Sequence, residues 1–301
     1  MTYDNLERGR GDAVKWGPLE QGDLSDLPRL REVFSTYRPA AVMHFAALAY
    51  VGESVSNPAL YYRNNILGAL NLFEAMRQFD VAAVVVSSSC AVYGAPESTP
   101  IDEDHPKHPI SPYGVGKWVV ERMLADLQRA HGLRSVCLRY FNAAGADPDG
   151  EIGETHDPET HLIPLVLDAA LGRQPHITVF GADYDTPDGT CLRDYIHVTD
   201  LAEAHVLALK WLLSGSEAST ALNLGVGKAW SVMEVIETAR RVTGRTIEVA
   251  AAPRRAGDPP VLVADPTRAG KILGWSPRRS SLETQIADAW RWHLLWHGKS
   301  G

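Results

Sequence analysis

The sequence contains only three cysteines, Cys90, Cys137 and Cys191, and they follow no spacing pattern. A disulfide framework uses an even number of cysteines, and a zinc site uses closely spaced pairs. We therefore expect reduced thiols in a protein core, with no disulfide and no cysteine-based metal site. This usage is typical of a cytoplasmic protein.

Long apolar segments are also missing. The most apolar run, residues 81–86, has the length of a strand, whereas a membrane-spanning helix needs about 20 apolar residues. The N-terminus has no basic stretch followed by an apolar one, so no secretory signal is expected. The sequence thus predicts neither a membrane segment nor a secretory leader.

The chain has no excess of positive charge. It contains 29 lysines and arginines against 37 aspartates and glutamates, and its formal net charge is -8. Nucleic acids and anionic membranes attract basic surfaces, so neither is an expected partner. A nucleotide ligand is compatible with this balance, because a few local cationic groups can hold it.

What is present is an alternation of strand-like and helix-like segments. The expected strands and helices of the first half are residues 25–37 (helix), 41–46 (strand), 57–76 (helix), 83–88 (strand), 111–130 (helix) and 135–140 (strand). A continuous apolar run such as residues 83–88 is typical of a parallel strand buried on both faces. The alternation predicts an α/β fold with a doubly wound parallel sheet.

From residue 144 the pattern loosens into a mixed α+β region rich in Asp, Pro and Gly, with a last helix at about residues 282–296. We therefore expect two domains: residues 1–143 form the Rossmann-like domain, and residues 144–301 form a smaller α+β domain. No internal repeat marks either part.

The strongest local motif joins Tyr113 and Lys117 at the start of a helix. Residues four apart lie on one helix face, so the ammonium group is a turn away from the phenol. A nearby cation stabilises the phenolate, which can then take a proton from a sugar hydroxyl. Most isolated Tyr-x-x-x-Lys pairs are solvated helix surface. The preceding strand, which ends in serines up to Ser89, favours the catalytic interpretation here.

The motifs then point to a family. The chain resembles the UDP-glucose 4-epimerase family of extended short-chain dehydrogenase/reductases in segments that occur in the same order, at residues 44–47, 51–54, 61–65, 87–94, 111–117, 138–142, 193–198 and 254–259. These segments extend over nearly the whole chain.

The resemblance implies a cofactor and its site. Tyr113 would be the base, Lys117 would tune it and bind the nicotinamide ribose, and Ser89 would contact the reacting hydroxyl. The cofactor would be NAD, bound in the first domain by these three residues together with Asp4, Asn5, Asp23, Leu24, Phe45, Ala46, Ala47, Asn64 and Phe141.

The resemblance also implies a UDP-sugar site, largely in the second domain. Besides Ser89 and Tyr113, its residues would be Asn142, His161, Val179, Phe180, Arg193, Arg255, Asp258 and Leu262. Guanidinium groups suit a diphosphate and carboxylates suit ribose hydroxyls, although each such residue alone would more often form a surface ion pair.

The implied activity is that of an isomerase. UDP-glucose and UDP-galactose would be interconverted by transient oxidation at C4, with NAD bound throughout. The resemblance further implies a homodimer that pairs the helices near residues 65–76 and 111–130.

Several alternatives stay open. The related 4,6-dehydratases carry an acidic pair where this chain has Cys90 and Ala91, so dehydration is disfavoured. An N-acetylated substrate is the nearest rival, because many relatives have Asn at the position of His161 and Tyr at that of Leu262. A decarboxylase, a non-catalytic NAD-binding protein and an inactive fragment are the others.

No G-x-G-x-x-G fingerprint precedes Asp4, although the acidic residue that meets the ribose usually follows it by about 20 residues. The expectation is that the first strand, turn and helix are missing, and that the neighbouring strands lose pairing. The chain as written would then not be a competent enzyme, with a misassigned start as the favoured explanation.

One segment imitates a metal site. Residues 156–161 contain two histidines and a glutamate, but they include a proline and lack helical His-Glu-x-x-His spacing. A loop is expected there, and no metal ligand is assigned.

Overall fold

The computed structural model describes residues 1–215, 218–255 and 258–298 and divides the chain into two compact units. Unit 1 comprises Met1–Gly94, Pro106–Arg139 and His205–Leu222. Unit 2 comprises Ala95–His105, Tyr140–Ala204 and Asn223–Gly301. Each unit is therefore built from segments that are separated in sequence.

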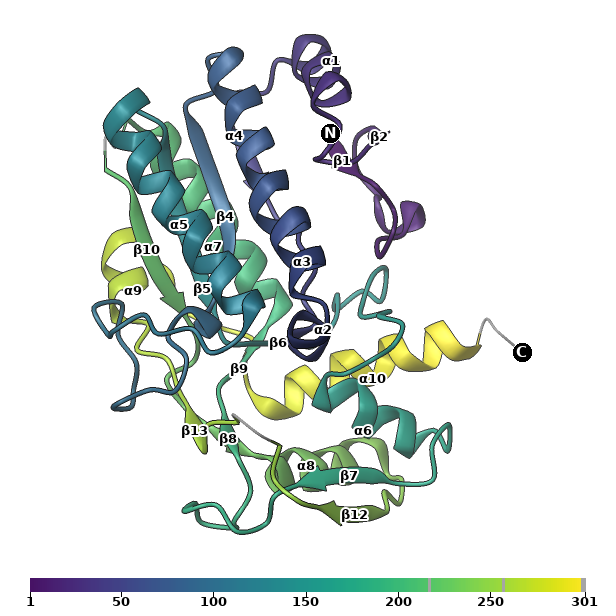
Figure 1. Cartoon of the computed structure of the whole chain (residues 1–301). Helices are drawn as coiled ribbons and strands as arrows, with labels where there is room; N and C mark the ends of the chain where they lie inside the picture. The colour runs from purple at the N-terminus through teal and green to yellow at the C-terminus, as the bar shows by residue number, and fades with distance from the viewer. Residues whose placement is uncertain (216–217, 256–257, 299–301) are drawn as a thin grey trace. The chain divides into compact units, whose positions relative to one another are not determined.

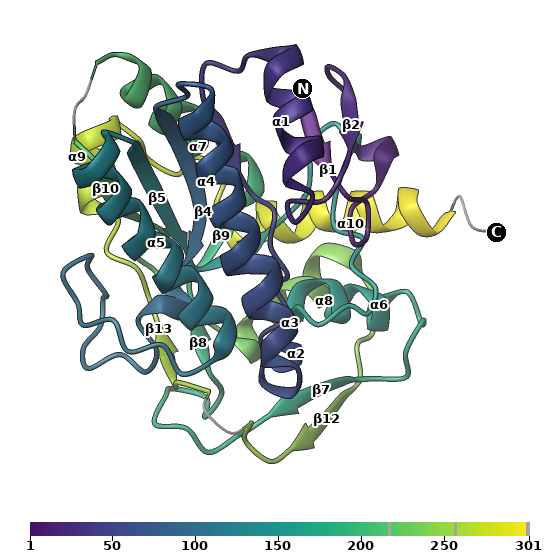
Figure 2. The same cartoon turned by 45° about the horizontal axis from the view of Figure 1, so that its top comes forward.

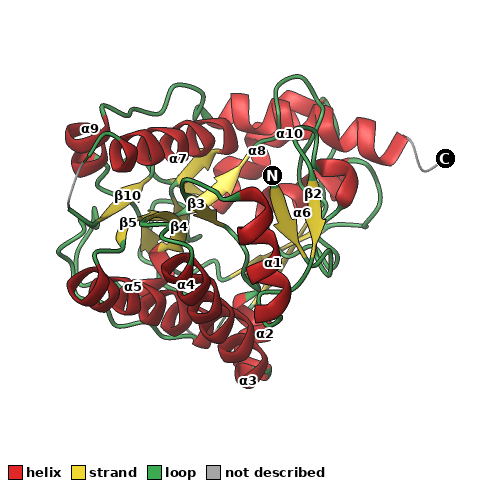
Figure 3. Cartoon of the chain, turned by 90° about the horizontal axis from the view of Figure 1, so that it is seen from above, coloured by secondary structure: helices red, strands yellow, loops and turns green. Residues whose placement is uncertain are grey.

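The main sheet has four strands in the order β10 (Thr220–Leu224), β5 (Arg134–Tyr140), β4 (Ala83–Ser89) and β3 (Val42–His44). β3 and β4 are parallel, and every residue of β4 is buried. Figure 3 shows α4 (Gly68–Gln78) and α5 (Pro112–His131) on one face, with the end of α7 (Val198–Leu213) on the other. The predicted Rossmann-like α/β fold is confirmed.

Two further strands lie apart from this sheet. β1 (Thr2–Asp4) and β2 (Leu19–Gln21) form a parallel pair, with η1 (Gly11–Ala13) between them in the chain and α1 (Leu27–Tyr37) beside them (Figure 2). Within the described residues, β1 does not pair with β3. This lack of pairing is what the sequence led us to expect.

The start of α1 differs from the prediction. The helix was expected to begin at Ser25, but the capping residue is Asp26, whose carboxylate accepts a hydrogen bond of 3.0 Å from the Arg29 amide. The Ser25 amide instead donates to Asp23. A carboxylate at this position satisfies an amide that the first helical turn leaves unpaired. The predicted end at Tyr37 is correct.

The long helix expected at residues 57–76 contains a wider turn. It comprises α3 (Pro58–Tyr61), the π-helical turn η2 (Tyr62–Leu67) and α4, after the short helix α2 (Val51–Ser56). Such π-turns are rare and often occur at functional sites. Here the turn carries buried Asn65, whose amide group accepts from the Leu48 amide at 2.8 Å and donates to its carbonyl at 2.9 Å.

An apolar core fixes these helices on the sheet. It contains side chains of α1, α4, α5 and of the strands, among them Leu30, Phe34, Phe73, Met76, Val84, Val86 and Leu124. Because α4 and α5 share this core with β4, their positions relative to the carboxyl end of β4 are set by packing.

Unit 2 contains small sheets and a group of helices. β7 (Ile177–Phe180) pairs with β12 (Val249–Ala252), β8 (Leu192–Arg193) with β11 (Trp230–Ser231) and β13 (Val261–Leu262), and β6 (Asn142–Ala144) with β9 (Tyr195–His197). The helices α6 (Leu162–Ala170), α8 (Val232–Thr243) and α10 (Leu282–Gly298) pack together (Figure 1), and α9 spans Thr267–Leu273.

Within the described residues, no helix combines the length and the apolar character needed to cross a membrane.

Candidate active site

The carboxyl end of β4 presents the candidate serine. Ser89 is the last residue of the strand, and its hydroxyl accepts a hydrogen bond of 3.2 Å from the Ala91 amide. This bond caps the short helical turn η3 (Cys90–Val92). The side chain is therefore held at the edge of the sheet where ligands bind in open α/β folds.

The first turn of α5 presents the candidate base. Ser111 caps the helix by accepting from the Gly114 amide at 3.2 Å, and Tyr113 follows Pro112 in the first turn. A Cβ on Gly114 would lie only 2.5 Å from the carbonyl oxygen of Ala91. Only glycine allows this approach, so the residue lets the start of α5 rest directly on the turn that follows Ser89.

Lys117 lies one turn further along α5, inside the unit. Its ammonium donates a 2.7 Å hydrogen bond to the Ser87 carbonyl and lies 5.7 Å from the centre of the Tyr113 ring. Burial lowers the pKa of Lys117 from 10.5 to about 8, against the opposing attraction of Glu121. The cation stays charged at neutral pH, where it favours the phenolate form of the tyrosine.

A buried ion pair supports this face of α5. The guanidinium of Arg139 donates to both carboxylate oxygens of Glu121, at 3.0 and 2.5 Å, and to the Tyr93 hydroxyl at 2.9 Å. The Ser88 hydroxyl also donates to Glu121, at 2.6 Å. The network ties α5 to β4 and β5 next to the lysine. Sequence reasoning missed this network, although Glu121 follows Lys117 by four residues, as Lys117 follows Tyr113.

A cavity of about 260 Å³ in unit 1 collects the residues expected to bind the nucleotide. Eight residues of unit 1 were assigned to the cofactor but not to catalysis, and all eight line this cavity. They are Asp4, Asn5, Asp23, Leu24, Phe45, Ala46, Ala47 and Asn64. The lining further includes residues that sequence reasoning did not assign: Tyr3, Glu7, Arg8, Gly9, Gly22 and Leu48.

Carboxylates at one wall of this cavity suit ribose and adenine. Asp4 ends β1, and its carboxylate accepts from the Leu6 amide at 2.7 Å. The Asn5 side chain donates to Asp23 at 2.6 Å. Hydrogen bonds from Ser25 and Asn5 lower the pKa of Asp23 despite partial burial, so the carboxylate is ionised. An acidic residue at the end of this strand favours a free ribose 2′-hydroxyl, as in NAD.

Another part of the lining is held by the π-helical turn. Asn64 donates to Asn65 at 2.9 Å, and Asn65 in turn clamps the backbone of Leu48. The segment with Phe45, Ala46 and Ala47 precedes Leu48, so the clamp fixes it. Strand β3 was expected to extend to residue 46, but it ends at His44. Phe45 is consequently 54% exposed rather than buried in the sheet.

In unit 2 three of the expected substrate residues meet. Arg193 donates to the Asp258 carboxylate at 3.1 Å and to the Pro259 carbonyl at 2.8 Å. Leu262 pairs with Arg193 between β13 and β8. The guanidinium is only 13% exposed, so an ionic partner stabilises its charge there. Ala256 and Gly257, from the family motif beside Asp258, lie outside the described residues.

The other expected substrate residues occupy varied places. Arg255 lies over the Phe180 ring, 3.9 Å from its centre, at the end of β7. The side-chain amide of Asn142 donates a hydrogen bond of 3.0 Å to the backbone carbonyl of Asp194. Burial raises the pKa of the Asp194 carboxyl to about 6, against hydrogen bonds from three backbone amides.

One of these residues and one cofactor residue are buried, whereas His161 is exposed. The Val179 side chain is packed in the apolar core of unit 2, so only its backbone can reach a ligand. His161 precedes α6, and its ring contacts Glu159 and the His156 ring. Phe141 is buried and follows β5.

Comparison with known proteins agrees with these features. A model of the NAD dependent epimerase/dehydratase family matches residues 2–225. A UDP-glucose 4-epimerase of Rhizobium meliloti (strain 1021) is 52% identical over 293 residues, 97% of this chain and 89% of that protein.

Solved structures give the same picture. The UDP-glucose 4-epimerase from Brucella ovis in complex with NAD is 53% identical, with a TM-score of 0.93 over 96% of this chain and 88% of that one. The UDP-Glc/GlcNAc 4-epimerase from Campylobacter jejuni is 38% identical, with a TM-score of 0.84 over 97% and 91% of the two chains. By sequence and by fold, this chain belongs to the NAD dependent epimerase/dehydratase family.

Proposed function

We infer that this chain is a UDP-glucose 4-epimerase, which interconverts UDP-glucose and UDP-galactose with NAD as its cofactor. The observation that carries this inference is the arrangement of Tyr113, Lys117 and Ser89 around the docked start of α5. A protein that only binds a dinucleotide has no need of a base. The relatives at about half identity carry the same activity in their names.

NAD would be held by the residues that line the cavity of unit 1, and when bound it would supply a hydride acceptor and donor for C4 of the sugar. The Tyr113 phenolate removes the C4 hydroxyl proton in the oxidation and gives it back in the reduction. Lys117 holds the positive charge that keeps the phenol acidic, and the Ser89 hydroxyl orients the C4 oxygen. Because the oxidation at C4 would be reversed in the same cycle, inversion of C4 would consume no net oxidant.

Residues of unit 2 are proposed to hold the UDP portion. Arg193 and Arg255 supply guanidinium groups for the diphosphate, and Asp258 a carboxylate for ribose hydroxyls. Asn142, His161, Val179 and Phe180 complete the proposed set. The ion pair of Arg193 with Asp258 and the ring contact of Arg255 support the proposal, because both orient a guanidinium before a ligand binds.

A dehydratase is the less favoured function. Elimination of water needs an acid and a base after the strand that ends at Ser89. Cys90 and Ala91 form η3 there, and neither supplies a carboxyl group.

Leu262 favours a wider substrate range. It lacks the bulk and the hydroxyl of Tyr, and we propose that this space admits an N-acetyl group at C2. Pocket-size effects typically amount to about 1–3 kcal/mol, or 10–200-fold, so the change broadens specificity rather than switching it. Leu262→Tyr is expected to lower kcat/KM for UDP-N-acetylgalactosamine by roughly 10-fold or more, with little change for UDP-galactose.

The measurement is the ratio of the two kcat/KM values in both proteins. Val261→Ile, on the neighbouring residue of β13, is the matched control. An equal ratio in Leu262→Tyr and in the unchanged chain would exclude Leu262 as the determinant.

We further propose a cytoplasmic homodimer. None of the three cysteines forms a disulfide within the described residues, which suits a reducing compartment. The helices α2, η2 and α4 carry exposed apolar side chains with exposed fractions of 37–63%. These are Val55, Tyr62, Leu67 and Leu70. A second copy that covers this face would remove them from water.

The activity is tested by incubating the purified chain with UDP-galactose and following both sugars by NMR. Conversion to an equilibrium mixture with UDP-glucose, without added oxidant or reductant, is expected. Formation of a deoxy or decarboxylated sugar would instead identify one of the rival reactions.

A further inference from the structure

A second cavity, of about 370 Å³, lies in unit 2 and has no part in the proposed reaction. Its lining is unusually rich in histidine and carboxylate, and includes Glu154, His156, Glu159, Asp168, His293 and His297. Arg173 is the one arginine or lysine among the described residues that line it.

Three of these side chains converge from two helices. Asp168 belongs to α6, whereas His293 and His297 lie four residues apart on one face of α10. The Nε2 atoms of His293 and His297 are 3.3 and 3.7 Å from the same oxygen of Asp168. All three candidate ligand atoms lie within 4.8 Å of one another. Packed helices hold the group in place.

Two of these three atoms are close to each other but form no hydrogen bond. Within the described residues, the Oδ1 atom of Asp168 and the Nε2 atom of His293 are buried and make no hydrogen bond, although they lie at ion-pair distance. The His293 side chain is only 7% exposed. Buried polar atoms are normally satisfied, and an absent ion is one of the recognised reasons for an exception.

The spacing fits a small tetrahedral ion. Zinc binds imidazole nitrogen and carboxylate oxygen at about 2.0–2.2 Å, which places tetrahedral ligand atoms roughly 3.4 Å apart. Two histidines with one carboxylate form a typical three-ligand set that keeps a fourth position open. We propose that Asp168, His293 and His297 bind a divalent transition metal ion of the zinc class, with the open position toward the cavity.

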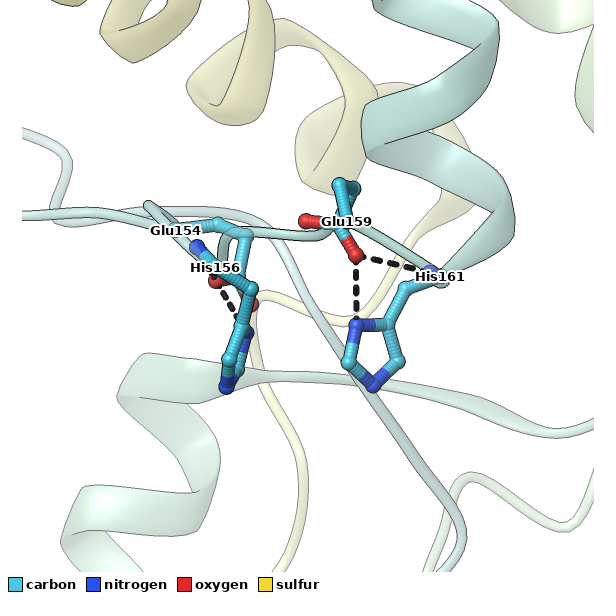
Figure 4. A group of neighbouring side chains, drawn as sticks. All are labelled: Glu154, His156, Glu159 and His161. Carbon is cyan, nitrogen blue, oxygen red and sulfur yellow. Dashed lines mark hydrogen bonds and ion pairs between the residues drawn. The ribbon is translucent and has the colours of Figure 1, made fainter. Parts of the chain in front are cut away.

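The neighbouring loop does not supply the ligands. Figure 4 shows the rings of His156 and His161 side by side, each with Nδ1 turned toward its own glutamate. Glu154 accepts from the His156 amide and forms an ion pair with the His156 ring, and Glu159 accepts from the His161 amide and contacts the His161 ring at hydrogen-bond distance. These contacts satisfy the carboxylates within the loop, in keeping with the loop expected from the sequence. Glu154 and Glu159 add negative charge to the lining of the cavity.

Arg173 competes with the proposed ion. Its Nε atom is 3.0 Å from the oxygen of Asp168 that faces both histidines, and its side chain is 50% exposed. In the metal-free chain this guanidinium neutralises the carboxylate. An incoming dication must displace it, so removal of the guanidinium should strengthen metal binding. A purely structural ion pair predicts no such gain.

The test uses the full chain without an affinity tag, stripped with a chelator and titrated with Zn²⁺ by calorimetry. Co²⁺ titration adds the absorption bands of tetrahedral nitrogen and oxygen coordination. One ion per chain is expected. His297→Gln, at a partly exposed position, should weaken binding at least about 10-fold. Arg173→Ala should strengthen it several-fold.

His176→Gln is the matched control, because His176 is exposed and lies outside the cavity. Circular dichroism and the unfolding temperature of each metal-free variant show whether it has folded. No uptake of either ion, unchanged affinity in His297→Gln, or affinity in Arg173→Ala that does not rise, would each overturn the proposal.

Discussion

Replacement of Tyr113 by Phe is expected to lower kcat by about 10²–10⁴-fold, equivalent to roughly 3–5 kcal/mol in the barrier. The change removes one hydroxyl from the first turn of α5. Ser111 and Gly114 still set the start of that helix, so the position of the ring should not move. Only the proton acceptor is lost.

Binding should separate chemistry from structure in this variant. Its affinity for a UDP-sugar is expected to stay within a few-fold of that of the unchanged chain. Tyr37→Phe on α1 is the control, since it removes a hydroxyl that donates to Glu20, outside the candidate site. A Tyr113→Phe protein that keeps more than about a tenth of the activity would show that another group is the base.

Replacement of Lys117 by Met is expected to reduce activity by about two orders of magnitude and to weaken NAD binding. A unit charge 5.7 Å from the tyrosine ring is worth about 3 kcal/mol to a phenolate at an effective dielectric constant of about 20. Loss of that charge removes this stabilisation of the phenolate, so less of the base is available. Weaker NAD binding distinguishes Lys117→Met from Tyr113→Phe.

The same substitution should alter how stability depends on pH. The pKa of Lys117 is 10.5 when unfolded and about 8 when folded, so below pH 8 the chain bears the full cost of a buried ammonium. That cost is on the order of 3 kcal/mol. Between pH 8 and 10.5 the unfolded state binds more protons, so this contribution makes the folded state progressively more stable.

Lys117→Met lacks this contribution. The free energy of unfolding of the variant minus that of the unchanged chain should therefore fall by about 3 kcal/mol between pH 7.5 and 10.5. Denaturant unfolding of the NAD-free proteins at the two pH values measures it. Parallel profiles would mean that the ammonium is not buried.

The local features of the site could be predicted from the sequence. Ser111 and Pro112 locate the start of α5, and the spacing of Tyr113 and Lys117 places the ammonium near the phenol ring, at 5.7 Å in the structure. Eight of the residues assigned to the nucleotide line one cavity, and all of them except Asn64 lie at or just after the carboxyl ends of β1, β2 and β3.

Features that depend on long-range contacts could not be predicted. Nothing local indicates that Glu121 and Arg139 pair inside the protein, or that residues 95–105 group with unit 2. Asp168 and His293 are more than a hundred residues apart in sequence, and only the packing of α6 on α10 brings them together.

The most direct test of the central claim follows the hydrogen at C4. UDP-galactose deuterated at C4 is incubated with the chain in ordinary water, and the product is examined by NMR. An epimerase that returns the same hydride to the opposite face yields UDP-glucose with the deuterium still at C4. Loss of the label to water, or inversion of C4 without a requirement for NAD, would contradict transient oxidation at this carbon.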